Sequence, residues 1–202
     1  YRLCVFDELP RSGLPERFES YGEYSRHVSV LIEAGLIEDA TMLWWDVRPS
    51  ATFPTLEMRA TDVCTRIDDA VCLAAIYVCI IRMLYRLRRG NQKWRTYTNM
   101  LISENRWRAQ RYGIDEGMVD FGKGAIVPFG ELLEELIELI QEDAEALDCV
   151  TEVHHARRIL EAGTSAHRQL ATFEKIKAAS GDEQKAFHAV VDELVTETVE
   201  DF

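Results

Sequence analysis

Apolar and polar positions alternate in two places within the first 61 residues. Residues 1–6 alternate from the start of the chain, and residues 55–61 do so again. Side chains of a β-strand point to opposite faces in turn, so both segments are predicted strands. Residues 44–48 form a further extended segment, and Pro49 and Pro54 exclude a helix from the connection that follows it. Residues 44–48 and residues 55–61, joined by this short connection, are predicted to form a β-hairpin.

The rest of the chain shows mainly helical periodicity. Apolar residues recur every three or four positions, and Ser20 with Glu23 provides a capping box for the first helix. The predicted helices span residues 20–35, 65–89 (capped by Thr65), 98–112, 130–147, 150–162, 165–179 and 182–198, and a small hairpin spans residues 118–127. The predicted fold class is therefore α+β, with a sheet portion and one helix in residues 1–64 and a mainly helical portion in residues 65–202.

The composition is that of a folded, acidic protein. The 202 residues are 47% hydrophobic and 29% charged, and the net charge is −12. A duplex-binding protein needs a positive face to displace counterions, so nucleic acid is not an expected partner. The basic run at residues 82–95, with its interleaved aromatic residues, could be read as a nucleic-acid site. Positive charge near the end of a helix, paired with acidic helices, also accounts for it.

Neither the cysteine spacing nor the hydropathy indicates export or a membrane span. The five cysteines contain no CxxC pair, which favours a reducing compartment. The longest apolar run, residues 70–81, has 12 residues and is too short to cross a bilayer. We therefore expect a cytoplasmic location and no membrane partner.

The chain begins within a predicted strand. Its first residue is Tyr1 rather than methionine, and the alternating pattern has no lead-in. We expect further sequence upstream of Tyr1, and a start at a natural domain edge is the alternative.

The chemically informative residues lie in the predicted hairpin. Glu57 and Arg59 are two positions apart on one strand, so their side chains share a face and lie about 7 Å apart. Such a pair can be a structural ion pair, or it can hold a metal ion and an anion over one phosphate chain. Carboxylate oxygens suit Mg²⁺, and the planar fork of arginine suits a phosphoryl group. Arg48 and Asp46, on the partner strand, offer a second clamp.

The hairpin also carries an extended signature. It reads Trp45-Asp46-Val47-Arg48-Pro49-Ser50, then Thr55-Leu56-Glu57-Met58-Arg59, then Asp62. This signature resembles that of the carboxylate–amine ligases of the glutamate–cysteine ligase type 2 family. Further matches in the same order are Tyr1-Arg2-Leu3, residues 10–15, residues 33–37, Glu104-Asn105-Arg106-Trp107-Arg108-Ala109 and residues 111–113. The resemblance covers about residues 1–113, and from residue 129 onward it rests only on length and helical character.

The resemblance implies a fold and a reaction. The family has a glutamine-synthetase-like catalytic fold, in which a curved antiparallel sheet binds ATP and divalent metal. The implied reaction activates a carboxylate, typically that of L-glutamate, as an acyl phosphate, which an amine such as that of L-cysteine then attacks. On this basis Glu57 is an expected ligand of Mg²⁺ or Mn²⁺. Arg59 and Arg48 are expected catalytic residues that bind the nucleotide and neutralise the transferring phosphoryl group. Arg2 is an expected clamp for a substrate carboxylate.

One part of the family pattern does not occur in these residues. The family's acidic Glu-x-Glu strand and its histidine-containing strand belong to an N-terminal half that we expect to be absent here. We therefore expect residues 1–202 to be the C-terminal part of one catalytic domain. One carboxylate cannot hold two or three metal ions, so we expect no ligase activity from this chain on its own. Dimers are common in the family, so a homodimer is expected, while the identity of the amine stays open.

A non-catalytic helical interaction module is the alternative function, and the hairpin distinguishes it from an enzyme. In an enzyme, Glu57, Arg59 and Arg48 should converge on an open concave face. In a packing module they should pair with each other or with the acidic helices. The role of Arg106 also stays open, because this residue either reaches the site from its helix or only supports the structure.

Overall fold

The chain folds into two compact units. The computed structural model describes residues 2–200. The first unit is made of residues up to 62 together with residues 97–111, and the second of residues 63–96 together with residues from 112 onward. The first segment of the first unit ends at residue 62, and the division expected at residue 64 stays a prediction. Residues 97–111 group with the sheet portion rather than with the other helices, so the helical portion is not one continuous block in sequence.

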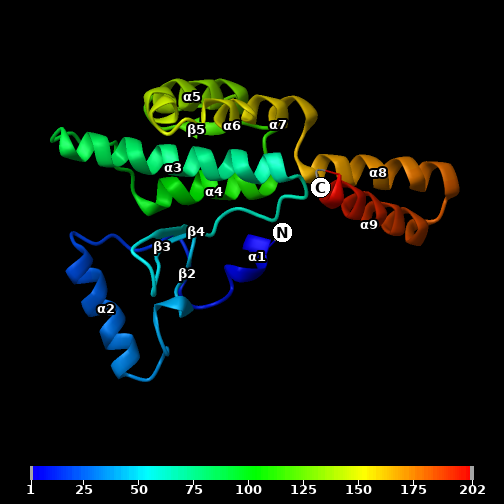
Figure 1. The fold of residues 1–202 in the computed structure, drawn as a ribbon. Coiled ribbons are helices and arrows are strands. Elements are labelled where there is room, and N and C mark those ends of the chain that lie inside the picture. Colours follow the sequence, from blue (N-terminus) through cyan, green and yellow to red (C-terminus); the bar gives the residue numbers. More distant parts are fainter. Residues whose placement is uncertain (1, 201–202) are drawn as a thin grey trace. The chain divides into compact units, whose positions relative to one another are not determined.

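The elements of the first unit are small (Figure 1). In chain order they are α1 (Arg2–Phe6), β1 (Ser12–Gly13), α2 (Tyr21–Glu33), the 3₁₀ helix η1 (Ala40–Met42), β2 (Trp44–Trp45), β3 (Val47–Pro49), β4 (Leu56–Met58) and α4 (Asn99–Tyr112).

Helix α1 replaces the strand predicted for residues 1–6. That prediction is wrong for Arg2–Phe6, and Tyr1 lies outside the described residues. Six alternating positions are too few to separate the period of a strand from that of a helix. No residue of α1 is fully buried, so the segment has no covered strand face. A helix satisfies backbone groups locally, as in the 2.9 Å bond from the Asp7 N–H to the Leu3 carbonyl.

The strands described in residues 2–200 form three separate pairs. β1 and β2 are parallel, β3 and β4 are antiparallel, and β5 (Met118–Asp120) and β6 (Ala125–Val127) are antiparallel. Both predicted hairpins are confirmed with shorter strands, and so is the α+β class. The glutamine-synthetase-like sheet stays a prediction, because no larger sheet joins these pairs within the described part of the chain.

An aromatic cluster packs α2 against the strands of the first unit. The helix begins as predicted, with Ser20 Oγ accepting the Glu23 N–H at 3.1 Å. Tyr24 is buried beside the fully buried Leu43, and the ring of Trp45 lies 6.4 Å from that of Tyr24. This cluster fixes the β2–β3 segment that carries the candidate site.

The second unit is helical. Its elements are α3 (Ile67–Arg89), β5, β6, α5 (Phe129–Ala146), α6 (Val150–His154), α7 (Ala156–Ala162), α8 (Ser165–Ser180) and α9 (Glu183–Val199). In Figure 1, α5 and α6 lie along α3, and α8 and α9 form a helical hairpin.

Two helix predictions in this unit need correction. The helix predicted for residues 150–162 is interrupted at His155, whose ring nitrogen Nε2 lies 2.8 Å from Asp69 Oδ1 on α3. Thr65 does not cap α3: the N-cap position is Arg66, without a side-chain cap hydrogen bond, and the Thr65 hydroxyl donates to Glu197 at 2.6 Å. In both places a long-range polar contact replaces the local arrangement that the sequence pattern favours.

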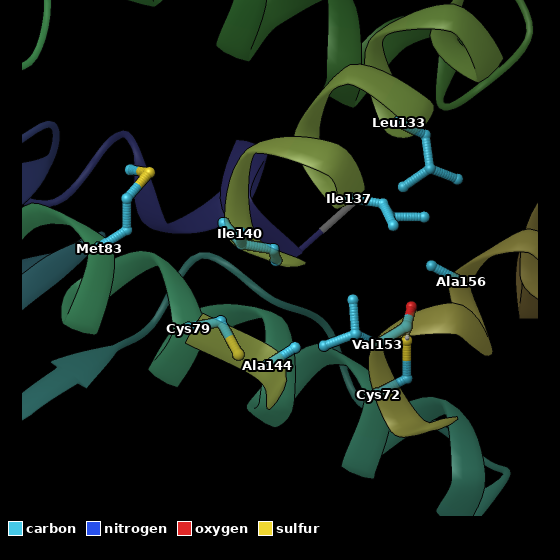
Figure 2. Packing of buried hydrophobic residues seen from close by; sticks show 9 residues of the cluster. All are labelled: Cys72, Cys79, Met83, Leu133, Ile137, Ile140, Ala144, Val153 and Ala156. Atoms are coloured by element: carbon cyan, nitrogen blue, oxygen red, sulfur yellow. Dashed lines mark hydrogen bonds between the residues drawn. The ribbon is translucent and has the colours of Figure 1, made fainter. Parts of the chain in front are cut away.

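The main core lies between α3, α5 and the α6–α7 segment (Figure 2). It contains Cys72, Cys79, Met83, Leu133, Ile137, Ile140, Ala144, Val153 and Ala156. Asp143 of α5 is also fully buried, and Arg82 and Arg86 of α3 pair with it. These ion pairs compensate a charge that would otherwise be costly to bury.

Helix α3 is long and apolar enough, by length and composition alone, to cross a membrane. In the structure it also has a packing face: Cys72, Cys79 and Met83 are buried against α5 and α6. On its other side Val78 and Tyr85 are 49% and 63% exposed. The absence of a membrane partner stays a prediction.

Candidate active site

The β3–β4 hairpin brings the predicted residues together. Its antiparallel register places Arg48 directly across from Glu57. Nε and Nη2 of Arg48 each lie 2.9 Å from Oε2 of Glu57, and Nη1 of Arg59 lies 3.8 Å from the same oxygen. One carboxylate therefore lies between two guanidiniums. The three side chains converge, and their chemical roles stay predictions.

Arg48 is the least accessible of the three. It is 6% exposed, and its Nη1 donates to the carbonyl of Leu43 at 2.8 Å and to that of Thr41. Every nitrogen of this guanidinium thus has a partner inside the protein. Arg48 could contact a phosphoryl group only by giving up part of its contact with Glu57.

Arg59 is the guanidinium of the hairpin that an external anion can reach. Its side chain is 30% exposed and that of Glu57 is 32% exposed. Burial lowers the pKa of Arg59, and the positive charges of Arg48 and Arg2 lower it further, while Glu57 opposes the shift. A bound anion would relieve this repulsion between like charges.

The residues present do not form a metal site by themselves. Among residues 2–200, no group of three or more His, Cys, Asp or Glu side chains is placed to hold a metal ion. Glu57 offers carboxylate oxygens that suit Mg²⁺ or Mn²⁺, but it is already in contact with Arg48 and Arg59. Glu57 would supply one ligand of a site that needs others.

Arg2 holds the segment that follows β4. Its Nη1 donates to the carbonyls of Arg59 and Thr61, each at 3.0 Å. Its guanidinium carbon also lies 5.4 Å from the centre of the Phe6 ring. No carboxylate in the described residues forms an ion pair with Arg2, so its charge is not compensated by direct contact.

Arg106 of α4 has a larger part in this cluster than the sequence indicated. Its Nη1 and Nη2 lie 2.7 and 2.8 Å from the two carboxylate oxygens of Asp7. Its Nε and Nη2 lie 2.5 and 3.1 Å from those of Asp46. Hydrogen bonds from Asp7, and then from Asp46, raise the pKa of Arg106 against the effect of burial. The only sequence signal for this role is its place in the 104–109 family match.

Two cavities open beside these side chains. The larger has a volume of about 340 Å³, and its lining includes Arg2, Asp46, Asp62, Arg106 and Gln110. The smaller is lined in part by Arg2, Arg59 and Arg106. Guanidiniums that lie far apart in sequence therefore face shared space within the first unit.

The sequence matches a known family over nearly its whole length. The sequence model of glutamate–cysteine ligase family 2 matches residues 1–196. The chain belongs to this family. The resemblance seen in residues 1–113 is thereby confirmed, and membership extends through the helices that follow.

Three relatives share the name "Putative glutamate–cysteine ligase 2". The protein from Rhodospirillum rubrum is 60% identical over 199 residues, which are 98% of this chain and 51% of the relative. The protein from Jannaschia sp. (strain CCS1) is 52% identical over 96% of this chain and 51% of its own length. The protein from Paracoccus denitrificans is 48% identical over 98% of this chain and 52% of its own length. The chain thus spans about half the length of the curated relatives it matches.

Proposed function

We propose that this chain contributes one wall of the active site of an ATP-dependent carboxylate–amine ligase of the glutamate–cysteine ligase type. The proposed reaction transfers the γ-phosphoryl group of ATP to the γ-carboxylate of L-glutamate, or of a similar acid, to give an acyl phosphate. An amine such as that of L-cysteine then attacks the acyl carbon, forms the amide and displaces phosphate. Membership of the family and the names of its relatives support the ligase class.

The observation that carries the proposal is that two guanidiniums beside the cavities, those of Arg59 and Arg2, are not held in a close ion pair. In their direct contacts Arg106 is balanced by Asp7 and Asp46, and Arg48 by Glu57. Arg59 lies farther from Glu57, and the hydrogen bonds of Arg2 go to carbonyl oxygens.

These two guanidiniums occur in a chain whose net charge is −12, and acyl-phosphate formation depends on neutralising phosphoryl charge. In this proposal Arg59 neutralises the transferring phosphoryl group. Arg48 also contacts the phosphoryl group if it gives up part of its contact with Glu57. Arg2 binds the carboxylate of the substrate. A divalent ion, Mg²⁺ or Mn²⁺, would neutralise further phosphate charge when bound, with Glu57 as one of its ligands. Because these residues do not complete a metal site, we propose that the isolated chain lacks ligase activity. We also propose a cytoplasmic homodimer without nucleic-acid or membrane partners.

The test is ADP release that depends on both L-glutamate and L-cysteine, measured with the intact protein. Arg59→Ala and Glu57→Gln should each lower turnover by at least about 10²-fold with little change in thermal stability. Arg17→Ala is a matched control, since Arg17 is exposed and has no partner for its side chain among the described residues. Near-normal turnover in both site variants would refute the assignment.

The alternative, a non-catalytic interaction module, is favoured by one feature of the hairpin and one of α9. Arg48 and Glu57 pair with each other, as packing residues would. On α9 an exposed apolar stripe repeats every four residues, at Phe187, Val191, Val195 and Val199. If this alternative holds, the hairpin variants should lower stability, and the intact protein should release no ADP in response to the substrates.

A further inference from the structure

A separate cavity lies in the helical unit, at the start of α3. Its volume is about 430 Å³, within the range of small-molecule sites. It is formed by the beginning of α3, by α7 and the turn after it, by the beginning of α8 and by the end of α9. The proposed ligase function gives this cavity no role.

The floor of the cavity is formed by Arg66, Asp69, His155 and Arg168, which share a network of polar contacts with Glu197, a residue outside the cavity lining. Arg168 Nε lies 2.6 Å from Glu197 Oε1, and its Nη2 lies 3.9 Å from Asp69. Arg66 also contacts Glu197, at 3.2 Å, and His155 contacts Asp69 at 2.8 Å. The side chains of Arg168, Glu197 and Asp69 are only 14%, 8% and 14% exposed. Each charged side chain of the floor therefore has a partner within this network.

The turn between α7 and α8 makes one wall rigid. Gly163 has a φ of +79°, and an added Cβ would lie 2.9 Å from the Cβ of His167. The carbonyl of Gly163 accepts Arg168 Nη1 at 3.0 Å, which ties the turn to the floor. His167 Nδ1 also accepts the Thr164 N–H at 3.1 Å, so the start of α8 is capped. The cavity thus has a wall that is preorganised by local geometry.

The rim differs from the floor because its charges have no partners. Arg158, Asp68 and Glu200 line the cavity, and all three are exposed. Within residues 2–200 the side chain of none of them makes a hydrogen bond or an ion pair. One cation and two anions are therefore available to a molecule that enters.

From this arrangement we infer a binding site for a small zwitterion, an amino acid or a dipeptide. A carboxylate accepts two hydrogen bonds from a guanidinium, so the acidic end of the ligand contacts Arg158. An ammonium group carries three donors, so the basic end lies between Asp68 and Glu200. A simple anion would meet the repulsion of two carboxylates, and a simple cation would leave Arg158 unpaired.

The experiment uses glycylglycine as the probe and the chain as it is. Binding is followed by isothermal titration at constant ionic strength, with acetate and ethylammonium as compounds of single charge. We expect saturable binding of glycylglycine and at least tenfold weaker binding of either single ion. Arg158→Ala and Asp68→Asn should each weaken the binding of glycylglycine at least tenfold. Arg88→Ala, at an exposed arginine of α3 outside the cavity lining, should leave it unchanged.

Three results would overturn the inference. They are the absence of saturable binding, binding of acetate as tight as that of glycylglycine, and unchanged affinity in both rim variants. Thermal melting of each variant checks the fold, and the exposed rim side chains can be replaced without opening the floor network. The titration measures binding in the helical unit, so its result does not depend on the outcome of the ligase assay.

Discussion

Removal of the carboxylate of Asp143 should destabilise the helical unit and leave the first unit nearly unchanged. Asp143 is fully buried, and its oxygens lie 2.9 and 3.3 Å from Nη2 and Nε of Arg86. Arg82 Nη1 forms a further contact. The carboxylate thus joins α5 to two turns of α3 beside the main core.

The size of the effect follows from the exposure of the partners. Breaking a buried ion pair costs about 3–5 kcal/mol when the remaining charge stays buried. The side chains of Arg82 and Arg86 are 35% and 36% exposed, so both can turn partly toward water after the change. We therefore expect Asp143→Ala to lower the free energy of unfolding by about 2–3 kcal/mol.

The assay is urea unfolding followed by two probes. Far-UV circular dichroism reports mainly on the helical unit. Three of the four tryptophans, Trp44, Trp45 and Trp107, belong to the first unit and dominate the fluorescence, and Trp94 belongs to the second unit. The midpoint of the circular dichroism transition should fall, and the fluorescence transition should shift much less. The control is Glu142→Ala, because Glu142 is 67% exposed and contacts the same Arg86 at 3.3 Å. That change should cost less than about 0.5 kcal/mol.

The pH dependence provides a second readout of the same carboxylate. Hydrogen bonds from Arg86, and then from Arg82, lower the pKa of Asp143 against the effect of burial. Its contribution to stability is therefore present above the unfolded pKa of about 4 and is lost as the pH falls through the lowered folded value. Asp143→Ala should lose less stability than the parent protein when the pH is taken below about 4. Equal effects of the Asp143 and Glu142 changes at neutral pH would refute the reasoning.

Two further predictions concern a thiol and a turn. Burial and the neighbouring Cys149 raise the pKa of Cys79 to about 12. Iodoacetamide at a pH of about 8 should therefore label the exposed Cys4 first and Cys79 last, which mass spectrometry can follow. Early labelling of Cys79 would contradict its burial. Gly117→Ala should lower thermal stability more than Gly124→Ala, because both positions have positive φ but only the Cβ at Gly117 would lie 2.2 Å from a backbone oxygen. Equal melting temperatures for the two variants would contradict this.

The hydrophobic periodicity of the sequence was sufficient to predict elements that are long or that satisfy their own backbone hydrogen bonds. The helices α5 and α9 and the β3–β4 hairpin lie close to their predicted ranges. The pattern failed at α1, where six residues carry too few periods to separate strand from helix. It also failed at His155, because the contact with Asp69 that marks the break comes from a residue 86 positions away.

The same limit applies to the candidate site. Arg48, Glu57 and Arg59 could be placed together because a hairpin has a fixed register and a strand has a period of two. The contact between Arg106 and Asp7 spans 99 positions, and no periodicity predicts it. Only the family match pointed to residues 104–109, and it gave no partner for Arg106.

The position of Asp46 links the packing of the first unit to its proposed chemistry. Its N–H donates to the Gly13 carbonyl at 2.7 Å, and its own carbonyl accepts the Arg59 N–H at 2.6 Å. Its carboxylate is held by Arg106, so the backbone of Arg59 is fixed by a residue that touches both β1 and α4. Arg48 in turn fixes Glu57, the carboxylate nearest to the Arg59 guanidinium. Arg59 is thus a reachable cation at the end of a rigid support. Asp46, Arg48 and Arg106 would therefore serve the proposed reaction through their packing, because they hold the phosphoryl-binding Arg59 in place.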